Sequence, residues 1–371
     1  MEQTAETTHG GLSEPLAERP PGANAVRMWL LATALLVLAM VLLGGATRLT
    51  DSGLSITEWQ PIIGAIPPLS EAHWQEAFDK YRQIPEYQQV NRGMSLAEFK
   101  VIYWWEWAHR FLGRLIGIVF AVPFFYFWLR GRLERPLAVK LLLVLVLGGL
   151  QGLMGWYMVM SGLVDRVDVS QYRLAAHLIL AAAIFGALLW LVFGLDGRKS
   201  ENRGSTRHRP LMLSAIGLCT LVFLQIALGA FVAGMDAGLA YNTWPLMGDE
   251  FVPGGLLAME PWYLNPFENA TTVQFDHRMV AYLVTIWAVL HAFAARAWDG
   301  AGTSGARSAV WLAALILLQV ASGIATLVWF VPFGMALIHQ AGAFIVFGLA
   351  LYHLHSLTGS GQAAGLRPAA A

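Results

Sequence analysis

Charged residues are scarce in this chain of 371 residues. Lys, Arg, Asp and Glu make up 13% of it and hydrophobic residues 57%, whereas about 25% of a soluble domain is charged. The 24 basic and 24 acidic residues cancel, so the net charge gives no indication of a nucleic-acid partner. One cysteine, Cys219, lies inside an apolar run, which excludes an internal disulfide and a cysteine-rich metal site. The composition indicates a polytopic membrane protein.

Long apolar runs define the predicted fold class, an all-α polytopic membrane protein with eight transmembrane helices. A helix needs about 20 apolar residues to cross the hydrocarbon core. Eight runs meet this length, at 28–47, 108–129, 138–160, 174–195, 211–233, 279–297, 308–330 and 336–357. Six glycines are expected where helices approach closely: Gly148, Gly149, Gly152, Gly155, Gly229 and Gly234.

The distribution of Lys and Arg predicts the orientation of the chain. Basic residues concentrate in the connections 130–140, 196–210 and 296–307, whereas 234–276 contains no Lys or Arg. Cytoplasmic loops carry the basic excess, so we expect both termini in the cytoplasm and the loops 48–107 and 234–276 outside. The first apolar run lacks a signal-peptide cleavage pattern, and 1–27 does not have the composition of a transit peptide. A bacterial inner membrane is the expected location.

Similar motifs recur in the two halves of the chain. Asp51-x-Gly53-Leu54 matches Asp236-x-Gly238-Leu239, and Leu150-Gln151-x-x-x-Gly155 matches Leu318-Gln319-x-x-x-Gly323. We therefore predict two four-helix bundles arranged as a parallel repeat. The predicted divisions are a disordered cytoplasmic tail at 1–27, an N-terminal half at 28–195, a cytoplasmic linker at 196–210, a C-terminal half at 211–357 and a cytoplasmic tail at 358–371.

Four histidines are repeated in the same way and form the candidate site. His109 and His277 each precede an arginine at the start of an apolar run, His177 opens the run 174–195, and His339 opens the run 336–357. A single histidine near a helix end is more often interfacial or hydrogen-bonded than a ligand. Two pairs at one predicted depth suit axial ligation of a haem between helices. Zinc or copper would need further protein ligands, and a transporter would be expected to show matching breaks in its helices.

Several motifs together resemble the haem A synthase family, in its mitochondrial and proteobacterial branch. They are E-W-A-H-R-F-L-G-R at 106–114, M-D-A-G-L-A-Y-N-T-W-P-L-M-G at 235–248, F-D-H-R at 275–278 and L-I-H-Q at 337–340. The resemblance covers nearly all of 28–357. Some bacterial members carry a cysteine pair in the outer loops, and this chain has none there.

The resemblance implies an enzyme that oxidises a methyl group of haem O to the formyl group of haem A, the haem of terminal oxidases. It implies that His277 and His339 bind the iron of a haem b cofactor, and that His109 and His177 frame the iron of the substrate haem. We expect the lipid bilayer, a haem O synthase and an electron-transfer protein as partners. A di-haem b electron carrier and a structural oxidase-assembly factor are the alternatives.

One carboxylate distinguishes the two halves. Glu106 stands three residues before His109, where it would share a helix face with that histidine, while its counterpart is the neutral Gln274. Glu106 is therefore the predicted catalytic residue, although a cap or a charge at the helix N-terminus would also explain it. Arg110 and Arg278 occur in both halves, so we expect them to contact haem propionates or to balance charge at the helix end.

Overall fold

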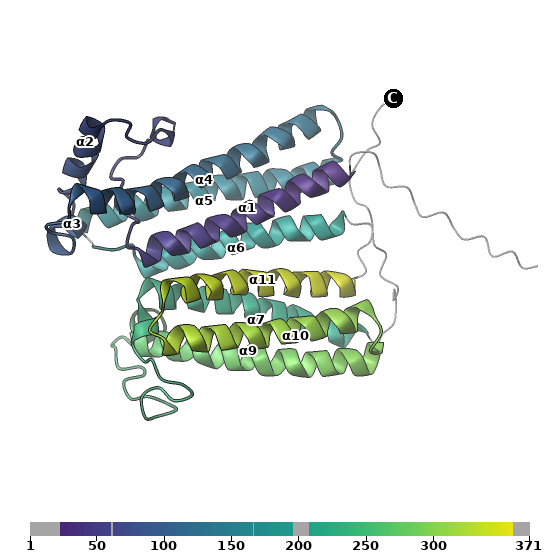
Figure 1. The fold of residues 1–371 in the computed structure, drawn as a ribbon. Helices are drawn as coiled ribbons and strands as arrows, with labels where there is room; N and C mark the ends of the chain where they lie inside the picture. Colours follow the sequence, from purple (N-terminus) through teal and green to yellow (C-terminus); the bar gives the residue numbers. More distant parts are fainter. Residues whose placement is uncertain (1–22, 61, 166, 196–207, 359–371) are drawn as a thin grey trace, which may run out of the picture.

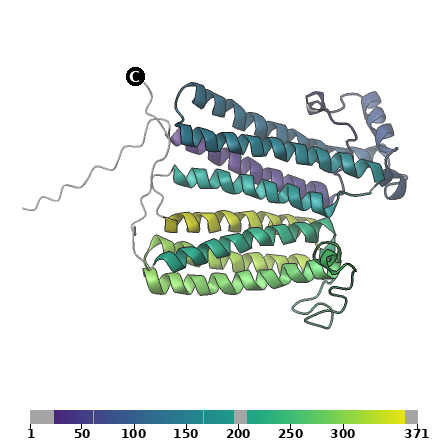
Figure 2. The same ribbon diagram turned by 180° about the vertical axis from the view of Figure 1, so that it is seen from behind.

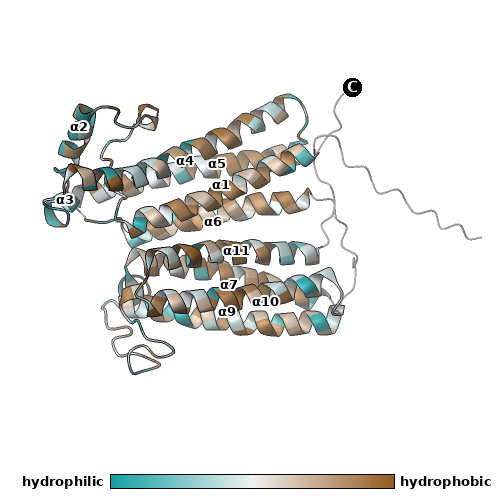
Figure 3. Cartoon of the chain, in the orientation of Figure 1, coloured by the Kyte–Doolittle hydropathy of each residue, from teal (hydrophilic) through white to brown (hydrophobic). Residues whose placement is uncertain are grey.

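Eight long helices form the body of the protein in a computed structural model, which describes residues 23–60, 62–165, 167–195 and 208–358 (Figure 1). All eight are long and apolar enough to cross a membrane, which confirms the predicted fold class. The described residues contain no strand. The eight helices are α1 (Ala23–Leu49), α4 (Leu96–Leu129), α5 (Arg135–Asp165), α6 (Gln171–Gly194), α7 (His208–Gly234), α9 (Ala270–Asp299), α10 (Ser304–Val328) and α11 (Phe333–Thr358). Figure 3 shows apolar residues along these helices and hydrophilic ones gathered at their ends.

Several helices extend beyond the predicted apolar runs because polar caps start them earlier. α4 begins 12 residues before 108, where the Ser95 hydroxyl accepts from the N–H of Glu98 and the Glu98 carboxylate accepts from Ser95, forming a capping box. The Asn269 side chain similarly caps α9 by accepting from Thr271 and Thr272. α10 ends at Val328, two residues earlier than predicted, since Phe330 adopts a left-handed backbone with φ of 58°.

The helices pack in two groups that follow the chain. In the first group α1 contacts α4 and α6, and α5 contacts α4 and α6; in the second, α7 contacts α9 and α11, and α10 contacts α9 and α11. The groups meet where α6 and α11 pack against each other and against α7 and α1 (Figures 1 and 2). That the groups are repeated copies, and that the domain divisions are as predicted, remain predictions. Most of the predicted linker and tails lie outside the described residues.

The start of α1 and the end of α11 lie at one end of the bundle, and the long loops lie at the other, which we call the outer end (Figure 1). The N-terminal outer loop contains the short helices η1 (Ile63–Ala65), α2 (Glu71–Tyr81) and α3 (Pro85–Gln89). The C-terminal outer loop contains η2 (Ala237–Leu239), η3 (Trp262–Leu264) and α8 (Asn265–Glu268).

The N-terminal outer loop has an apolar core of its own, formed by residues of α2, α3 and the first turns of α4. Glu86 is buried in it and accepts hydrogen bonds from the Tyr81 hydroxyl and the Asn91 amide. Burial raises the pKa of Glu86 to about 8 and also raises the pKa of Tyr81. The Glu86 carboxyl is therefore mostly protonated at neutral pH.

Candidate functional site

All four candidate histidines lie toward the outer end of the bundle. His177, His277 and His339 are the seventh, eighth and seventh residues of α6, α9 and α11. His109 is the fourteenth residue of α4, because that helix extends beyond the others. The expectation that each histidine opens its helix is therefore correct in outline for three of them and wrong for His109.

The structure brings each predicted pair together. The rings of His277 and His339 have centroids 6.5 Å apart and planes at 79°, and His109 and His177 are close enough to interact electrostatically. With a metal–nitrogen bond of about 2.0–2.1 Å on each side, one metal ion between two imidazoles separates their centroids by roughly 6 Å. No group of three or more His, Cys, Asp or Glu side chains with metal-binding geometry occurs among the described residues. Two histidines without a third protein ligand fit a metal whose remaining ligands come from a porphyrin.

A glycine on the neighbouring helix makes room for each imidazole. A Cβ atom added to the glycine would lie 2.6–3.3 Å from Cε1 of the facing ring. The pairs are Gly44 with His109, Gly155 with His177, Gly229 with His277 and Gly323 with His339. A larger residue at Gly44 or Gly323 would force the facing ring to move, and one at Gly155 or Gly229 would press against it.

The predicted glycine contacts between helices are correct for only part of the set. At Gly148, Gly149 and Gly152 an added Cβ would meet no atom within 4 Å, so these glycines do not mediate helix packing as expected. Gly234 does allow a close approach, because a Cβ there would lie 2.9 Å from the Cα of Gln171. Gly155 and Gly229 admit histidine rings.

A glutamine four residues before the glycine docks three of the four histidine helices. The side-chain amides of Gln151, Gln225 and Gln319 donate to the backbone carbonyls of His177, His277 and His339 at 2.7–3.1 Å. Residues four apart share one helix face, so Q-x-x-x-G places an amide and a gap beside the same histidine. The motif occurs at 151–155, 225–229 and 319–323. The first and last of these indicated the repeat, but the third occurrence and the connection of the motif with the histidines were missed. The glycine that faces His109 is Gly44, and the residue four positions before it is Met40 instead of glutamine.

The ring nitrogens of the C-terminal pair have polar partners. The Gln225 amide lies 3.1 Å from Nδ1 of His277, and the Gln319 amide lies 3.1 Å from Nδ1 of His339. The Ser322 hydroxyl donates to the Gln319 carbonyl and lies 3.0 Å from Nδ1 of His339, so its oxygen is able to accept the Nδ1–H. Such a bond leaves the Nε2 lone pair of His339 for a metal.

The ring nitrogens of the N-terminal pair are not held in this way. Nδ1 of His109 and Nδ1 of His177 are buried without a hydrogen-bond partner among the described residues. Met154 stands directly before Gly155, where Ser322 stands directly before Gly323. In the N-terminal half, Met40 thus stands in the place of Gln225 and Met154 in the place of Ser322.

Glu106 lies in the interior of α4, ten residues from its start, so it does not cap the helix. Its side chain is buried, and both oxygens are occupied. Oε2 accepts from the Ser55 hydroxyl and the Ile56 N–H at 2.7 Å, and Oε1 accepts from Arg110 Nη2 at 2.6 Å. Gln274 is also buried but donates to the Tyr241 carbonyl at 3.0 Å. The carboxylate therefore joins α4 to the outer loop.

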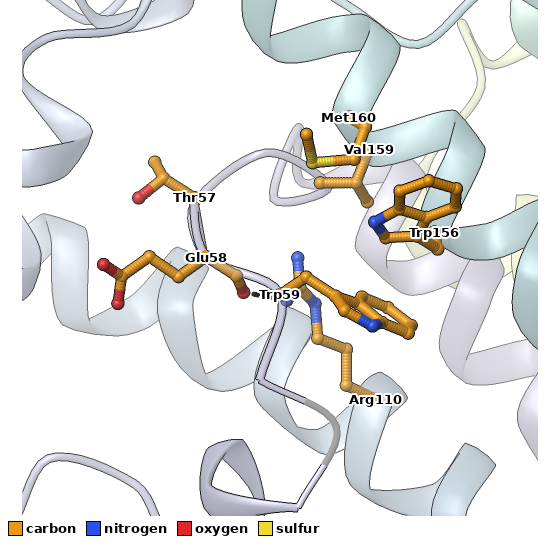
Figure 4. A pocket seen from close by; sticks show the side chains of 7 residues that line it. All are labelled: Thr57, Glu58, Trp59, Arg110, Trp156, Val159 and Met160. Carbon is orange, nitrogen blue, oxygen red and sulfur yellow. Dashed lines mark hydrogen bonds between the residues drawn. The ribbon is translucent and has the colours of Figure 1, made fainter.

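Arg110 and Arg278, the arginines expected to contact haem propionates, both donate hydrogen bonds to the outer loops. Arg110 donates to the carbonyls of Ile56 and Glu58 at 2.7 and 3.0 Å, and Figure 4 shows its guanidinium directed at this segment, where a shallow pocket lies beside Trp59 and Trp156. Arg278 donates to the carbonyls of Tyr241, Thr243 and Leu246 at 2.9–3.3 Å. The Arg278 Nε atom is buried without a partner among the described residues.

The two sites are adjacent across the contact between the groups. Gln340, next to His339, donates to the Val41 carbonyl on α1 at 3.0 Å. Its side chain lies against Gly45, and the adjacent Gly44 faces His109. α1 and α11 therefore join the surroundings of the two histidine pairs.

A second histidine pair lies deeper in the C-terminal group. His291 and His353 follow His277 and His339 by 14 residues on the same helices, a distance of about 21 Å along an α-helix. Their Nε2 atoms are 2.7 Å apart, and their Nδ1 atoms lie 2.9 and 2.8 Å from the hydroxyls of Ser214 and Ser308. This spacing leaves no room for a metal ion between the rings.

Fixed groups at both ends of this chain of hydrogen bonds determine its direction. The Trp287 N–H, which only donates, bonds Ser214 Oγ, and the Gly305 carbonyl, which only accepts, bonds Ser308 Oγ. Ser214 therefore donates to His291, His291 donates from Nε2 to His353, and His353 donates from Nδ1 to Ser308. Both imidazoles are neutral, and each has a hydrogen-bond partner at both ring nitrogens.

The fold and the site define a multi-pass membrane protein with two histidine pairs placed between helices toward the outer end of the bundle. Comparison with known proteins is more specific. The family model described as cytochrome oxidase assembly protein (COX15-CtaA) matches residues 27–351, and the chain belongs to this family.

Relatives with high identity carry one name. The chain is 56% identical over 334 residues to the heme A synthase of Parvibaculum lavamentivorans, covering 90% of this chain and 94% of the relative. It is 54% identical over 335 residues to the heme A synthase of a Chelativorans species and 51% identical over 336 residues to that of Rhizobium meliloti. These matches cover 90% of this chain and 91% and 90% of the relatives.

Proposed function

We propose that this chain is a haem A synthase, which oxidises a methyl group of haem O to the formyl group of haem A for the assembly of terminal oxidases. The name of its relatives supports the reaction. The observation that carries the assignment of two unlike sites is the difference in ring partners: the Nδ1 atoms of His277 and His339 have polar partners, whereas those of His109 and His177 have none.

His277 and His339 are the proposed ligands of a resident haem b. Their centroid separation fits one metal ion between them, and glycine gaps with glutamine and serine partners hold the rings in place. A group that accepts the Nδ1–H, as the Ser322 oxygen can beside His339, typically changes metal affinity 10- to 100-fold, as a permanent cofactor requires. When bound, a haem b supplies one-electron redox chemistry.

His109 and His177 are the proposed ligands of the substrate haem. A substrate must enter and its product must leave, so weaker fixation of these rings suits the role. Thioether side chains are flexible and apolar, and Met40 and Met154 leave the imidazoles free to adjust. The contact of Gln340 with Val41 places the two sites next to each other, which suits electron transfer between them.

Two successive hydroxylations account for the product. With water as the oxygen source, the methyl group and one water give a hydroxymethyl group, two protons and two electrons. A second water gives a gem-diol with two more protons and two more electrons, and the gem-diol loses water to give the aldehyde. The proposed electron-transfer partner accepts the four electrons. Glu106 is proposed to provide the negative charge beside this carbon, since it lies one helical turn from His109 and is buried. Its bonds with Ser55, Ile56 and Arg110 hold it in one orientation.

The arginines have different proposed roles. Arg278 has a buried Nε–H without a partner, which is suited to a haem propionate. The contacts of Arg110 with Ile56, Glu58 and Glu106 favour a role in holding the outer loop over the site. We further propose a bacterial inner membrane location, with both termini cytoplasmic and the haem sites toward the periplasm, and a haem O synthase and an electron-transfer protein as partners.

The pigments of the purified protein test the function. A haem A synthase expressed together with a haem O synthase should yield haem O and haem A in addition to haem b on acid extraction. Extraction of haem b alone, in an amount that fills two sites per chain, would favour the di-haem electron carrier. A protein that extracts without pigment and is still required for oxidase assembly would favour the assembly factor.

A further inference from the structure

The N-terminal outer loop contains a strongly apolar segment that the proposed function does not use. Residues 59–70 include no charged residue. Four large aliphatic side chains within it are exposed: Ile62 at 83%, Ile63 at 72%, Ile66 at 63% and Leu69 at 77%. Clustered aliphatic side chains at such exposure are unusual on a surface that faces water, and they indicate an interaction site.

The loop leading to this segment runs along α4 in the direction of the membrane. Arg110 binds the carbonyls of Ile56 and Glu58, and one turn further Arg114 donates to the Gln60 carbonyl at 3.0 Å. A Cβ added to Gly64 would lie 3.2 Å from Arg114 Nη2. The turn η1 thus lies beside Arg114, beyond the level of Glu106 and further along α4 toward its apolar half.

The surface of α4 at this level faces lipid. Phe111, Leu115, Ile118 and Val122 are exposed at 37–63% and recur at helical spacing, so they form one outward stripe. α4 has 34 residues, which is more than the roughly 20 that cross the hydrocarbon core. Its outer part therefore projects from the membrane, and Arg114 lies close to the boundary. The exposed aliphatic side chains of 62–69 continue the lipid-facing surface of the helix.

We propose that residues 62–69 insert into the outer leaflet, with Ile62, Ile63, Ile66 and Leu69 among the acyl chains just below the headgroups. The occupant of this surface is phospholipid, because the apolar stripe of α4 lies beside it and residues 62–69 carry no charge. The neighbouring Arg114 guanidinium donates to the Gln60 carbonyl. Trp59 and Trp156 lie in contact, with centroids 6.4 Å apart, and are partly exposed nearby, as is typical of aromatic residues at the membrane interface. The segment anchors the outer loop to the bilayer.

Site-specific fluorescence quenching tests this proposal without measuring activity. Cys219 is the one cysteine of the chain, so Cys219→Ala provides a background for Ile63→Cys labelled with a small environment-sensitive fluorophore. The full-length protein is reconstituted in phospholipid nanodiscs, with nitroxide lipids as the membrane quencher and iodide as the aqueous quencher. Gln83→Cys, an exposed position on the polar side of the same loop, and Ile118→Cys, on the lipid-facing stripe, are the matched controls.

The label at Ile63 should show blue-shifted emission, quenching by lipids with a nitroxide near the headgroup, and little quenching by iodide. The label at Gln83 should be quenched by iodide, and the label at Ile118 by nitroxide deeper in the acyl chain. Two results would overturn the proposal. Iodide quenching at Ile63 equal to that at Gln83 would place the segment in water, and protection from both quenchers would show that protein covers it.

Discussion

The two histidine pairs differ less in position than in what surrounds them. Each of the four rings fits against a glycine of a neighbouring helix. In the C-terminal pair both Nδ1 atoms have a polar partner, while in the N-terminal pair both are buried without one. Both halves thus provide a glycine gap for each ring, but only the C-terminal half provides polar partners for the Nδ1 atoms. This is the difference expected between a cofactor that stays and a substrate that exchanges.

The largest expected effect separates the two pairs directly. His277→Leu and His339→Leu should each abolish haem b binding, because removal of one axial imidazole leaves a large apolar gap and an incomplete ligand set. His109→Leu and His177→Leu should keep haem b and lose haem A production. Reduced-minus-oxidised spectra and haem extraction measure both. Retention of haem b in the first two variants, or normal haem A output in the second two, would contradict the assignment.

The second prediction concerns the carboxylate that only the N-terminal half contains. Glu106→Gln should retain haem b and lower haem A formation by a factor on the order of 10²–10⁴, the usual effect of losing a positioned acid–base group. The ratio of haem O to haem A in membranes measures this at matched expression.

Ser55→Ala is the matched control for Glu106. It removes one hydrogen bond between the outer loop and Glu106 but keeps the carboxylate. If Glu106 serves chemistry, Ser55→Ala should retain most of the activity. Equal losses in the two variants would show that Glu106 acts only by holding the loop.

The sequence was sufficient to predict the eight helices, because apolar length identifies a membrane span. The repeated motifs also led to four histidines that the structure brings together in two pairs, and their role as ligands remains a proposal. The start of α4 was missed, since its first 12 residues are stabilised by packing against α2 and by the Ser95 cap rather than by an apolar run. The roles of Gln225 and Ser322 depend on which helices become neighbours, and a single sequence does not contain that information. The contacts of Glu106 with Ser55 and Ile56 cross 50 positions of the chain and were equally out of reach.

Exchanging the surroundings of the rings should sharpen the comparison. Gln225→Met combined with Ser322→Met gives the C-terminal pair the surroundings of the N-terminal pair, and we expect haem b affinity to fall about 10- to 100-fold. Retention of haem b during dilution or challenge with a haem-binding protein measures this. The opposite change, Met40→Gln with Met154→Ser, should slow release of the product haem. Unchanged haem b affinity in the first variant would show that the ring partners do not determine retention.

The deeper pair, His291 and His353, occurs in the C-terminal half alone, because Pro123 and Leu191 stand at the matching places, 14 residues after His109 and His177. His353→Leu should lower stability by about 1–3 kcal/mol, since it leaves buried groups of His291 and Ser308 without partners. His291→Leu with His353→Leu should cost less than the sum of the single changes. Thermal unfolding in detergent, followed by haem b absorbance, provides this double-mutant cycle, and strict additivity would show that the two rings are not coupled.

The final prediction concerns Glu86, in the packed core of the N-terminal outer loop. Its pKa of about 8 in the folded protein lies above the ordinary value of 4.5, so between these limits the folded loop binds a proton that the opened loop has lost. The contribution of Glu86 to stability is therefore fully present below about pH 4.5 and is lost as the pH rises through about 8, at up to about 1.4 kcal/mol per pH unit.

Glu86→Gln keeps a neutral group of similar shape and should remove this dependence. Amide hydrogen exchange of α2 and α3, compared between wild type and variant at each pH, measures local opening. Protection in the wild type should fall below that of the variant as the pH rises from 6 toward 8, while Glu76→Gln, on the exposed face of α2, should follow the wild type. Parallel curves for wild type and Glu86→Gln would show that Glu86 is already ionised in the folded loop.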